Sequence, residues 1–156
     1  MRFIHLYVYT FIRLCVYGII CIQKNYSKTN ELKIKFMFTY SFEKLEVWQN
    51  SRSLVKFIYQ ITKNFPDEEK YGITNQIRRA AISVSSNLAE GSSRKTFKEQ
   101  ARFTQISFAS LLELLNQLIL SNDLKYITDD ELLKFRETIE IIGNKLNALH
   151  KSQINK

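Results

Sequence analysis

The chain has 156 residues, which is long enough for one domain with a substantial core and too short for two comfortable ones. One Pro and four Gly leave few positions that break a helix, so the composition favours an all-α fold over a turn-rich β fold. The formal net charge of +8 is uneven, because residues 1–40 hold six of the 23 Lys and Arg but one of the 15 Asp and Glu, so the high charge alone does not identify a nucleic-acid-binding protein.

Residues 1–40 differ in composition from the rest of the chain. Residues 3–22 are almost wholly apolar or aromatic, and no small-x-small cleavage site of a signal peptide follows them. Twenty helical residues span about 30 Å, enough to cross a bilayer core, but Arg13 near the centre would cost about 2.5–3.5 kcal/mol there. Three interpretations stay open: a leader outside a native protein that starts at Met37, a membrane anchor, and a soluble or disordered arm.

Both cysteines, Cys15 and Cys21, also lie in this segment. Their spacing is typical of neither a redox pair nor a zinc site, and no disulfide scaffold is indicated. Because residues 41–156 contain no cysteine, the sequence favours a reducing compartment, and we expect a cytoplasmic protein.

Four amphipathic helices are expected between Ser41 and Lys151, with residues 152–156 as a short tail. The first begins after Ser41, a good N-cap residue, and ends before Pro66, since the residue that precedes a proline is disfavoured in a helix. Its apolar row, which includes one small serine, consists of Val47, Ser51, Leu54, Ile58, Ile61 and Phe65.

The second helix is expected from about Thr74, after the polar connection 67–72. It is rich in Ala and Ser, and small side chains let a neighbouring helix approach closely. Gly91 is predicted to end it as a left-handed cap. Its apolar side consists of Ile73, Ile77, Ala80, Ala81, Val84 and Leu88.

Capping boxes predict where the last two helices begin, Thr96-x-x-Glu99 for the third and Thr128-x-x-Glu131 for the fourth. The apolar row of the third helix consists of Phe97, Ala101, Thr104, Phe108, Leu111, Leu115 and Leu118. The row of the fourth follows the a/d spacing of left-handed bundles and consists of Leu132, Phe135, Ile139, Ile142, Leu146 and Leu149.

Short connections require antiparallel neighbours, so the pattern predicts an up-down-up-down four-helix bundle over residues 41–151. The third helix is apolar over more than one face between Phe103 and Leu120. This excess indicates either a subunit interface or the most central helix of the bundle.

No combination of residues in the chain points to catalysis. His5 lies in the N-terminal segment and His150 near the end of the last helix, so neither can be placed beside a nucleophile and an orienting acid. A glycine-rich phosphate loop and the Glu-x-x-His motif of di-iron bundles are both missing from the sequence. We therefore expect a non-enzyme with no catalytic residue, no metal site, no cofactor and no small-molecule substrate.

A basic cluster lies on the second and third helices and consists of Arg78, Arg79, Arg94, Lys95, Lys98 and Arg102. Only Glu90 and Glu99 oppose it within residues 78–102. In a helix, Arg94, Lys98 and Arg102 would form one row of like charges, which is mildly destabilising, and Lys95 would pair with Glu99. Because stability alone would not select this row, we expect it to contact the backbone of RNA or DNA. An ordinary solvated face, or pairing with acids of another helix or subunit, is the alternative, above all for Arg78 and Arg79.

The stretch from Phe42 to about Lys151 resembles the four-helix bundle family of the 23S ribosomal RNA intervening sequence protein. The matching motifs are FEKLEVWQ at residues 42–49, YGITNQIRRAA at residues 71–81 and SSNLAEG at residues 85–91. Family members usually show SNIAEG in the last of these, so Leu88 is a conservative departure. Residues 1–40 have no counterpart in the family.

The resemblance implies an antiparallel bundle that assembles into a ring-shaped homopentamer, with Asn87 and Glu90 as structural residues. A similar bundle, the accessory variability protein of diversity-generating retroelements, is a basic pentamer that binds nucleic acid and a reverse transcriptase. We therefore expect a homo-oligomeric bundle that binds RNA or DNA through the basic cluster. The alternatives are a scaffold or accessory subunit that binds a protein partner without nucleic acid, and a membrane-anchored bundle if residues 3–22 are retained.

Overall fold

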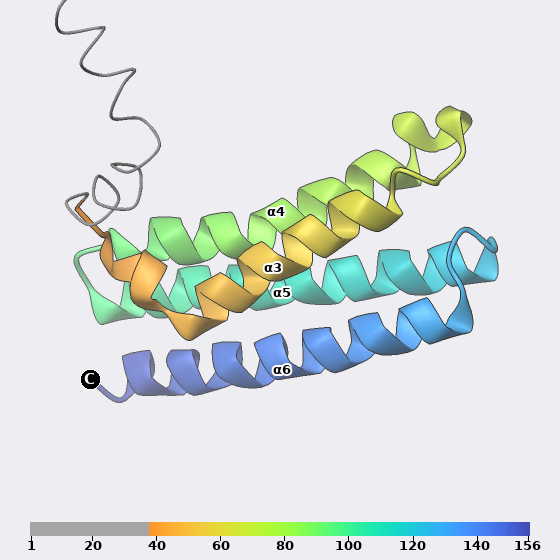
Figure 1. Ribbon diagram of the computed structural model, residues 1–156. Coiled ribbons are helices and arrows are strands. Elements are labelled where there is room, and N and C mark those ends of the chain that lie inside the picture. Colours follow the sequence, from red (N-terminus) through yellow and green to blue (C-terminus); the bar gives the residue numbers. More distant parts are fainter. Residues whose placement is uncertain (1–37) are drawn as a thin grey trace, which may run out of the picture. The chain divides into compact units, whose positions relative to one another are not determined.

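The structure is a computed structural model that describes residues 38–156, and Tyr40–Lys156 form one compact unit. The predictions for residues 1–37, namely a leader, an anchor or an arm and the two cysteines, lie outside the described residues. The described chain is all-helical as predicted, with no strand, and consecutive helices run in opposite directions (Figure 1). Its elements are η1 (Ser41–Lys44), α3 (Glu46–Ile61), η2 (Asp67–Lys70), α4 (Ile73–Ser92), α5 (Phe97–Asp123) and α6 (Asp129–Ile154).

One apolar core lies between the four helices. The apolar rows predicted for the first and last helices face this core. Every member of the first row, from Val47 to Phe65, is buried, and so are the four members of the last row from Phe135 to Leu146. Both predicted N-caps are confirmed: the Thr96 and Thr128 hydroxyls accept hydrogen bonds from the backbone N–H groups three residues later. The large apolar side chains with almost no exposed surface are Leu54, Ile58, Ile77, Val84, Leu111, Leu114, Leu118, Phe135, Ile142 and Leu146.

The prediction that Ser41 caps the first helix is wrong. Residues 41–44 form a separate 3-10 turn, in which Tyr40 is the N-cap and its backbone N–H donates to the Glu43 carboxylate at 2.9 Å. Leu45 is extended (φ −73°, ψ 119°) and separates this turn from α3. The turn is held by aromatic packing, because the rings of Phe42 and Trp48 meet edge to face at 5.0 Å.

The predicted left-handed cap at Gly91 is also wrong, because α4 continues through Ser92 and Ser93 caps it in a right-handed conformation. Gly91 is needed for a different reason. A Cβ at this position would lie 2.7 Å from the Cβ of Phe103 on α5, closer than side chains approach one another. The absence of a side chain therefore lets α4 and α5 meet at this point.

The contact between α4 and α5 is the most extensive in the described chain, as the small residues of α4 predicted. The Ser107 hydroxyl donates to the Val84 carbonyl at 2.8 Å, and the Ser83 and Ser110 hydroxyls lie 2.9 Å apart. This contact alters the predicted row of α5, because small polar residues occupy positions next to α4. The buried residues of α5 are Ala101, Thr104, Ser107, Ser110, Leu111, Leu114, Gln117, Leu118 and Ser121.

Three predicted members of that row are less buried than expected. Phe108 and Leu115 pack at the edge of the core, and Phe97, in the first turn of α5, is 46% exposed. Among the described helices, α5 is the one long and apolar enough to cross a membrane by length and composition, a property that it shares with the central helices of bundles.

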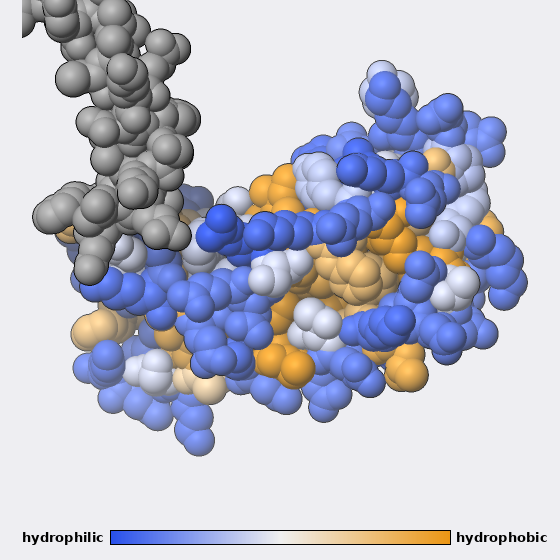
Figure 2. Space-filling view, viewed as in Figure 1, coloured by the Kyte–Doolittle hydropathy of each residue, from blue (hydrophilic) through white to orange (hydrophobic). Residues whose placement is uncertain are grey.

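The seam between α3 and α6 is the least extensive of the helix contacts. Phe57 stacks on Phe135 with ring centroids 4.4 Å apart, and the Lys145 ammonium pairs with the Glu46 carboxylate. On the face drawn in Figure 2, hydrophobic side chains show between these two helices, framed by hydrophilic ones. The core is therefore closed more loosely on this side than between α4 and α5.

Replacing Gly91 by Ala tests the close approach of α4 and α5. Overpacking typically costs about 1–3 kcal/mol, more than the roughly 0.5–1 kcal/mol that Ala gains over Gly inside a helix. Gly143→Ala is the matched control, because a Cβ there would meet its nearest neighbour at an ordinary 3.5 Å. In urea denaturation we expect a lower midpoint for Gly91→Ala and a higher one for Gly143→Ala; equal midpoints would contradict the steric explanation.

Candidate nucleic-acid interface

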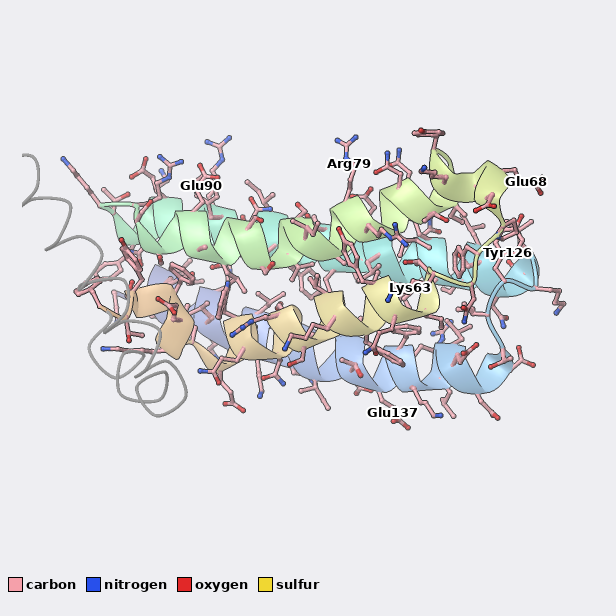
Figure 3. The ribbon with its side chains drawn as sticks, turned by 45° about the horizontal axis from the view of Figure 1, so that its top comes forward. Lys63, Glu68, Arg79, Glu90, Tyr126 and Glu137 are labelled. Atoms are coloured by element: carbon pink, nitrogen blue, oxygen red, sulfur yellow. The ribbon has the colours of Figure 1, made fainter. Side chains whose placement is uncertain are left out.

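The structure divides the six residues of the basic cluster between two places. Arg78 and Arg79 lie in the first half of α4, whereas Arg94 and Lys95 lie in the connection to α5 and Lys98 and Arg102 lie in its first turns. Arg79 and Arg94 are about four helical turns apart, or roughly 20 Å along the axis. Figure 3 shows Arg79 well separated along α4 from Glu90, which lies close to that connection.

Arg78 is occupied within the fold. Its Nε donates to the Thr62 hydroxyl at 2.8 Å and its Nη2 to the Thr62 carbonyl at 3.2 Å, and its guanidinium lies over the Tyr59 ring at 5.0 Å. Thr62 caps α3, so Arg78 supplies both a donor and a positive charge at a helix C-terminus, where free carbonyls need them. Arg78 therefore has partners on another helix, as one alternative expected, but they belong to a threonine and not to an acid.

Arg94 is also held by neighbouring groups. It forms an ion pair with Glu90 one turn earlier, its guanidinium lies 4.5 Å from the centre of the Phe103 ring, and its Nε is buried. Its carbonyl accepts a hydrogen bond from the Gln100 side chain at 2.9 Å. Arg94 thus fastens the connection between α4 and α5 beside the Gly91 contact, which gives Glu90 a structural role as the resemblance implies.

The helical row of Arg94, Lys98 and Arg102 does not form. Thr96 is extended (φ −107°, ψ 143°) and α5 begins at Phe97, so Arg94 precedes the helix. The predicted pair of Lys95 and Glu99 is wrong as well, because the Glu99 carboxylate accepts a hydrogen bond from the Thr96 hydroxyl at 3.0 Å instead.

Three cations of the cluster, Lys95, Lys98 and Arg102, remain exposed around the start of α5. Within residues 38–156, the ion pairs are Arg94 with Glu90 and Lys145 with Glu46, so none of these three cations forms an ion pair with a described acid. Arg79 is exposed on α4 and likewise has no ion pair among the described residues. Of the six cations, Arg78 and Arg94 are therefore held by partners within the fold, and the other four have no ion pair among the described residues.

A groove of about 760 Å³ lies between the first turns of α5 and the last turns of α6, and we call it the basic groove. Lys98 and Arg102 line one wall, and His150 and Lys156 line the other, with Glu99 as the single acid. The Thr104 hydroxyl donates to the Gln153 side chain at 2.8 Å and holds the two walls together. The remaining lining residues are Phe97, Ala101, Gln105, Gln153 and Ile154.

Sequence reasoning missed the α6 wall of this groove. Helix α6 continues to Ile154, three residues into the predicted tail, and so brings Lys156 to the same wall as His150 beside α5. The predicted antiparallel topology contained the signal, because it places the start of the third helix beside the end of the fourth. A continuous apolar row ending at Leu149 gave no indication that the helix extends further.

At the other end of the bundle, where Figure 3 labels Tyr126 and Glu68, the Tyr126 hydroxyl donates to the Glu69 carboxylate at 3.4 Å. Burial of the phenol, together with the negative charges of Glu69 and Glu68, raises the pKa of Tyr126. The phenol is therefore neutral at physiological pH and supplies no base. Among the described residues, no group of three His, Cys, Asp or Glu side chains is arranged to hold a metal ion.

Comparison with known proteins identifies the family. Residues 43–148 match the family model described as the 23S rRNA-intervening sequence protein. The chain belongs to this family. A search of curated proteins gives no match. Among solved structures, a protein of unknown function from the S23 ribosomal protein family of Bacteroides thetaiotaomicron VPI-5482 is 24% identical; the match covers 70% of this chain and 95% of that chain, with a TM-score of 0.49.

In this member of the 23S rRNA-intervening sequence protein family, α5 also presents an apolar surface. Leu112 is 49% exposed, and Ile106 and Leu120 are exposed as well. Beside Leu112, a second hollow of about 320 Å³ between α5 and α6 is lined by Phe108, Leu115 and Ile139. The predicted excess of apolar surface on this helix is thus present outside the core.

Replacing Arg78 by Ala tests its role at the end of α3. Hydrogen bonds from charged groups contribute about 1.5–3 kcal/mol each when lost, so we expect a fall in the free energy of unfolding of this order. The neighbouring Arg79→Ala is the control and should change stability by less than about 0.5 kcal/mol, as exposed substitutions do. Thermal and urea unfolding measure both; an unaltered Arg78→Ala protein would refute the capping role.

Proposed function

We propose that this protein is a cytoplasmic, homo-oligomeric bundle that binds the sugar–phosphate backbone of RNA or DNA without catalysing a reaction. One observation carries the proposal: Lys95, Lys98 and Arg102 gather at the start of α5, exposed and without an acid partner in the described chain. The two arginines with internal partners, Arg78 and Arg94, contribute to stability, and Arg79 adds a peripheral cation.

The physical argument concerns the cost of the cluster to the free protein. Cations at a helix N-terminus oppose the helix dipole, and like charges close together repel each other. A phosphate backbone relieves both effects and releases its own condensed counterions when it binds. Lys156 on the opposite wall extends the same surface, so a strand that lies along the basic groove meets cations from both walls.

Self-association would multiply this surface. The exposed apolar side chains of α5 supply a contact area for a second copy, and the family resemblance favours a homopentamer. Several weak backbone sites on one ring act together on a long nucleic acid and raise its overall affinity without any new contact.

Charge reversal at Lys98 and Arg102 tests the nucleic-acid surface. For single-stranded RNA, each phosphate contact contributes about 0.7 to the slope of log affinity against log salt. The double variant Lys98→Glu, Arg102→Glu should bind at least about tenfold more weakly in filter-binding titrations. The slope of its log affinity against log salt should be smaller in magnitude by about 1.4. The double variant Lys56→Glu, Lys63→Glu is the matched control, with Lys56 exposed on α3 and Lys63 exposed just after its end, and it should bind as the parent does. An affinity that ignores salt, or survives the reversal, rejects the proposal.

A charge within the apolar surface of α5 tests self-association. Leu112→Asp should shift the mass measured by light scattering from an oligomer to a monomer, because a carboxylate cannot be buried unpaired at a subunit contact. Leu124→Asp is the control, since Leu124 is 52% exposed but lies beyond the end of α5. A parent protein that is monomeric at every concentration would remove this part of the proposal.

A second candidate is a scaffold or accessory subunit that binds a protein partner, and the hollow beside Leu112 favours it. In this case the apolar surface of α5 receives another protein, and the basic groove is a solvated end of the bundle. Pull-down from nuclease-treated lysate separates the two candidates, because an association through nucleic acid is lost on nuclease treatment whereas a direct protein contact is kept.

A further inference from the structure

Phe97 is placed unusually for a large aromatic side chain. It is the first residue of α5, is 46% exposed, and lies between two hollows. One is the basic groove, and the other is a hollow of about 270 Å³ at the end of the bundle, whose lining includes Leu45, Leu88 and Leu149. The aromatic ring therefore forms a wall of the basic groove and is not part of the closed core.

The ring of Phe97 already attracts a cation. The Lys156 ammonium lies 5.2 Å from its centre, at the distance of a cation–π contact. Lys156 is exposed at the end of α6 and its side chain is long, so this contact can exchange for another at little cost. The face of the ring is thus accessible from the groove.

An exposed aromatic ring beside unpaired cations is the arrangement by which proteins bind single-stranded nucleic acid, since bases stack on the ring while cations follow the backbone. The other apolar groups of the groove are Ala101 and Ile154, and its polar groups besides the cations are Gln105, Gln153, His150 and the carboxylate of Glu99. Its volume of about 760 Å³ lies within the roughly 300–1,000 Å³ of sites that enclose a small molecule, so the groove is large enough for a nucleotide.

We infer that the basic groove receives one unpaired base of a single-stranded nucleic acid, stacked on Phe97, with the adjacent phosphates on Lys98 and Arg102. Lys156 leaves the ring and contacts a phosphate when the base enters. A base inside a duplex must first leave its stack to enter the groove, which costs free energy, so the site selects single strands over duplexes. This inference rests on the proposed function and adds the kind of nucleic acid that the surface accepts.

The experiment compares three probes of equal length: a single strand that carries 2-aminopurine, the same strand with abasic sites, and a duplex. The parent protein should quench 2-aminopurine fluorescence and bind the base-bearing strand at least fivefold more tightly than the abasic one. Phe97→Ala should lose roughly 5- to 150-fold in affinity for the base-bearing strand, the range for one stacked base, and keep its affinity for the abasic strand.

Tyr71→Ala is the matched control. Tyr71 is 81% exposed and also has a cation beside its ring, Lys70 at 5.7 Å, but it lies just before α4 and lines none of the hollows described above. Its replacement should leave all three affinities unchanged. Phe97→Leu preserves an apolar side chain without a ring, and unfolding curves for each variant confirm that the bundle is intact.

The outcomes separate this inference from the proposed function. Equal affinity of the parent for base-bearing and abasic strands, or full affinity in Phe97→Leu, overturns base stacking while backbone binding stands. Tighter binding to the duplex than to the single strand also overturns it. Failure to bind any of the three probes at low salt overturns the proposed function, and the inference with it.

Discussion

The close approach of α4 and α5 is the constraint on which the rest of the structure depends. Gly91 admits the Cβ of Phe103, and the Ser107 hydroxyl bonds directly to the backbone of α4 at Val84. A side chain at position 91 would push the two helices apart at the turn that joins them. That turn carries Arg94 and Lys95 and sets the start of α5, so the same contact that closes the core also positions the charged end of the bundle.

The periodicity of the sequence was sufficient to predict the helices and their order, because each row of apolar residues reports which side of a helix is buried. It was not sufficient to choose between neighbouring rows of α5, where apolar residues occupy more than one face. The close approach of α4 decided which row of α5 is buried. Ser107 and Ser110 are small enough to face α4, whereas the larger Phe108 lies at the edge of the core. Gly91 illustrates the same limit. Its position near the end of a helix suggested a left-handed cap, whereas the structure shows that a glycine is needed there because α5 lies too close for a side chain.

The candidate site was predictable as a concentration of charge but not as a surface. The sequence identified all six cations. It did not show that Arg78 is bound by Thr62 or that Arg94 pairs with Glu90, because these contacts exist only in the folded chain. The opposite wall of the groove was missed because it comes from a segment about fifty residues later in the chain, joined to α5 by the hydrogen bond of Thr104 with Gln153. Local charge patterns therefore indicate candidates, and the fold decides which of them face solvent.

The unequal helix contacts have a consequence for motion. Helix α3 meets α6 through contacts that include the Phe57–Phe135 stack and one exposed ion pair, and its contacts with α4 and α6 are both less extensive than those that α5 makes with α4 and α6. Segments with fewer buried contacts open at lower free-energy cost than the remainder of a domain. Helix α3 is therefore the helix expected to open at the lowest free-energy cost, and its amides are expected to exchange with solvent before those of α5.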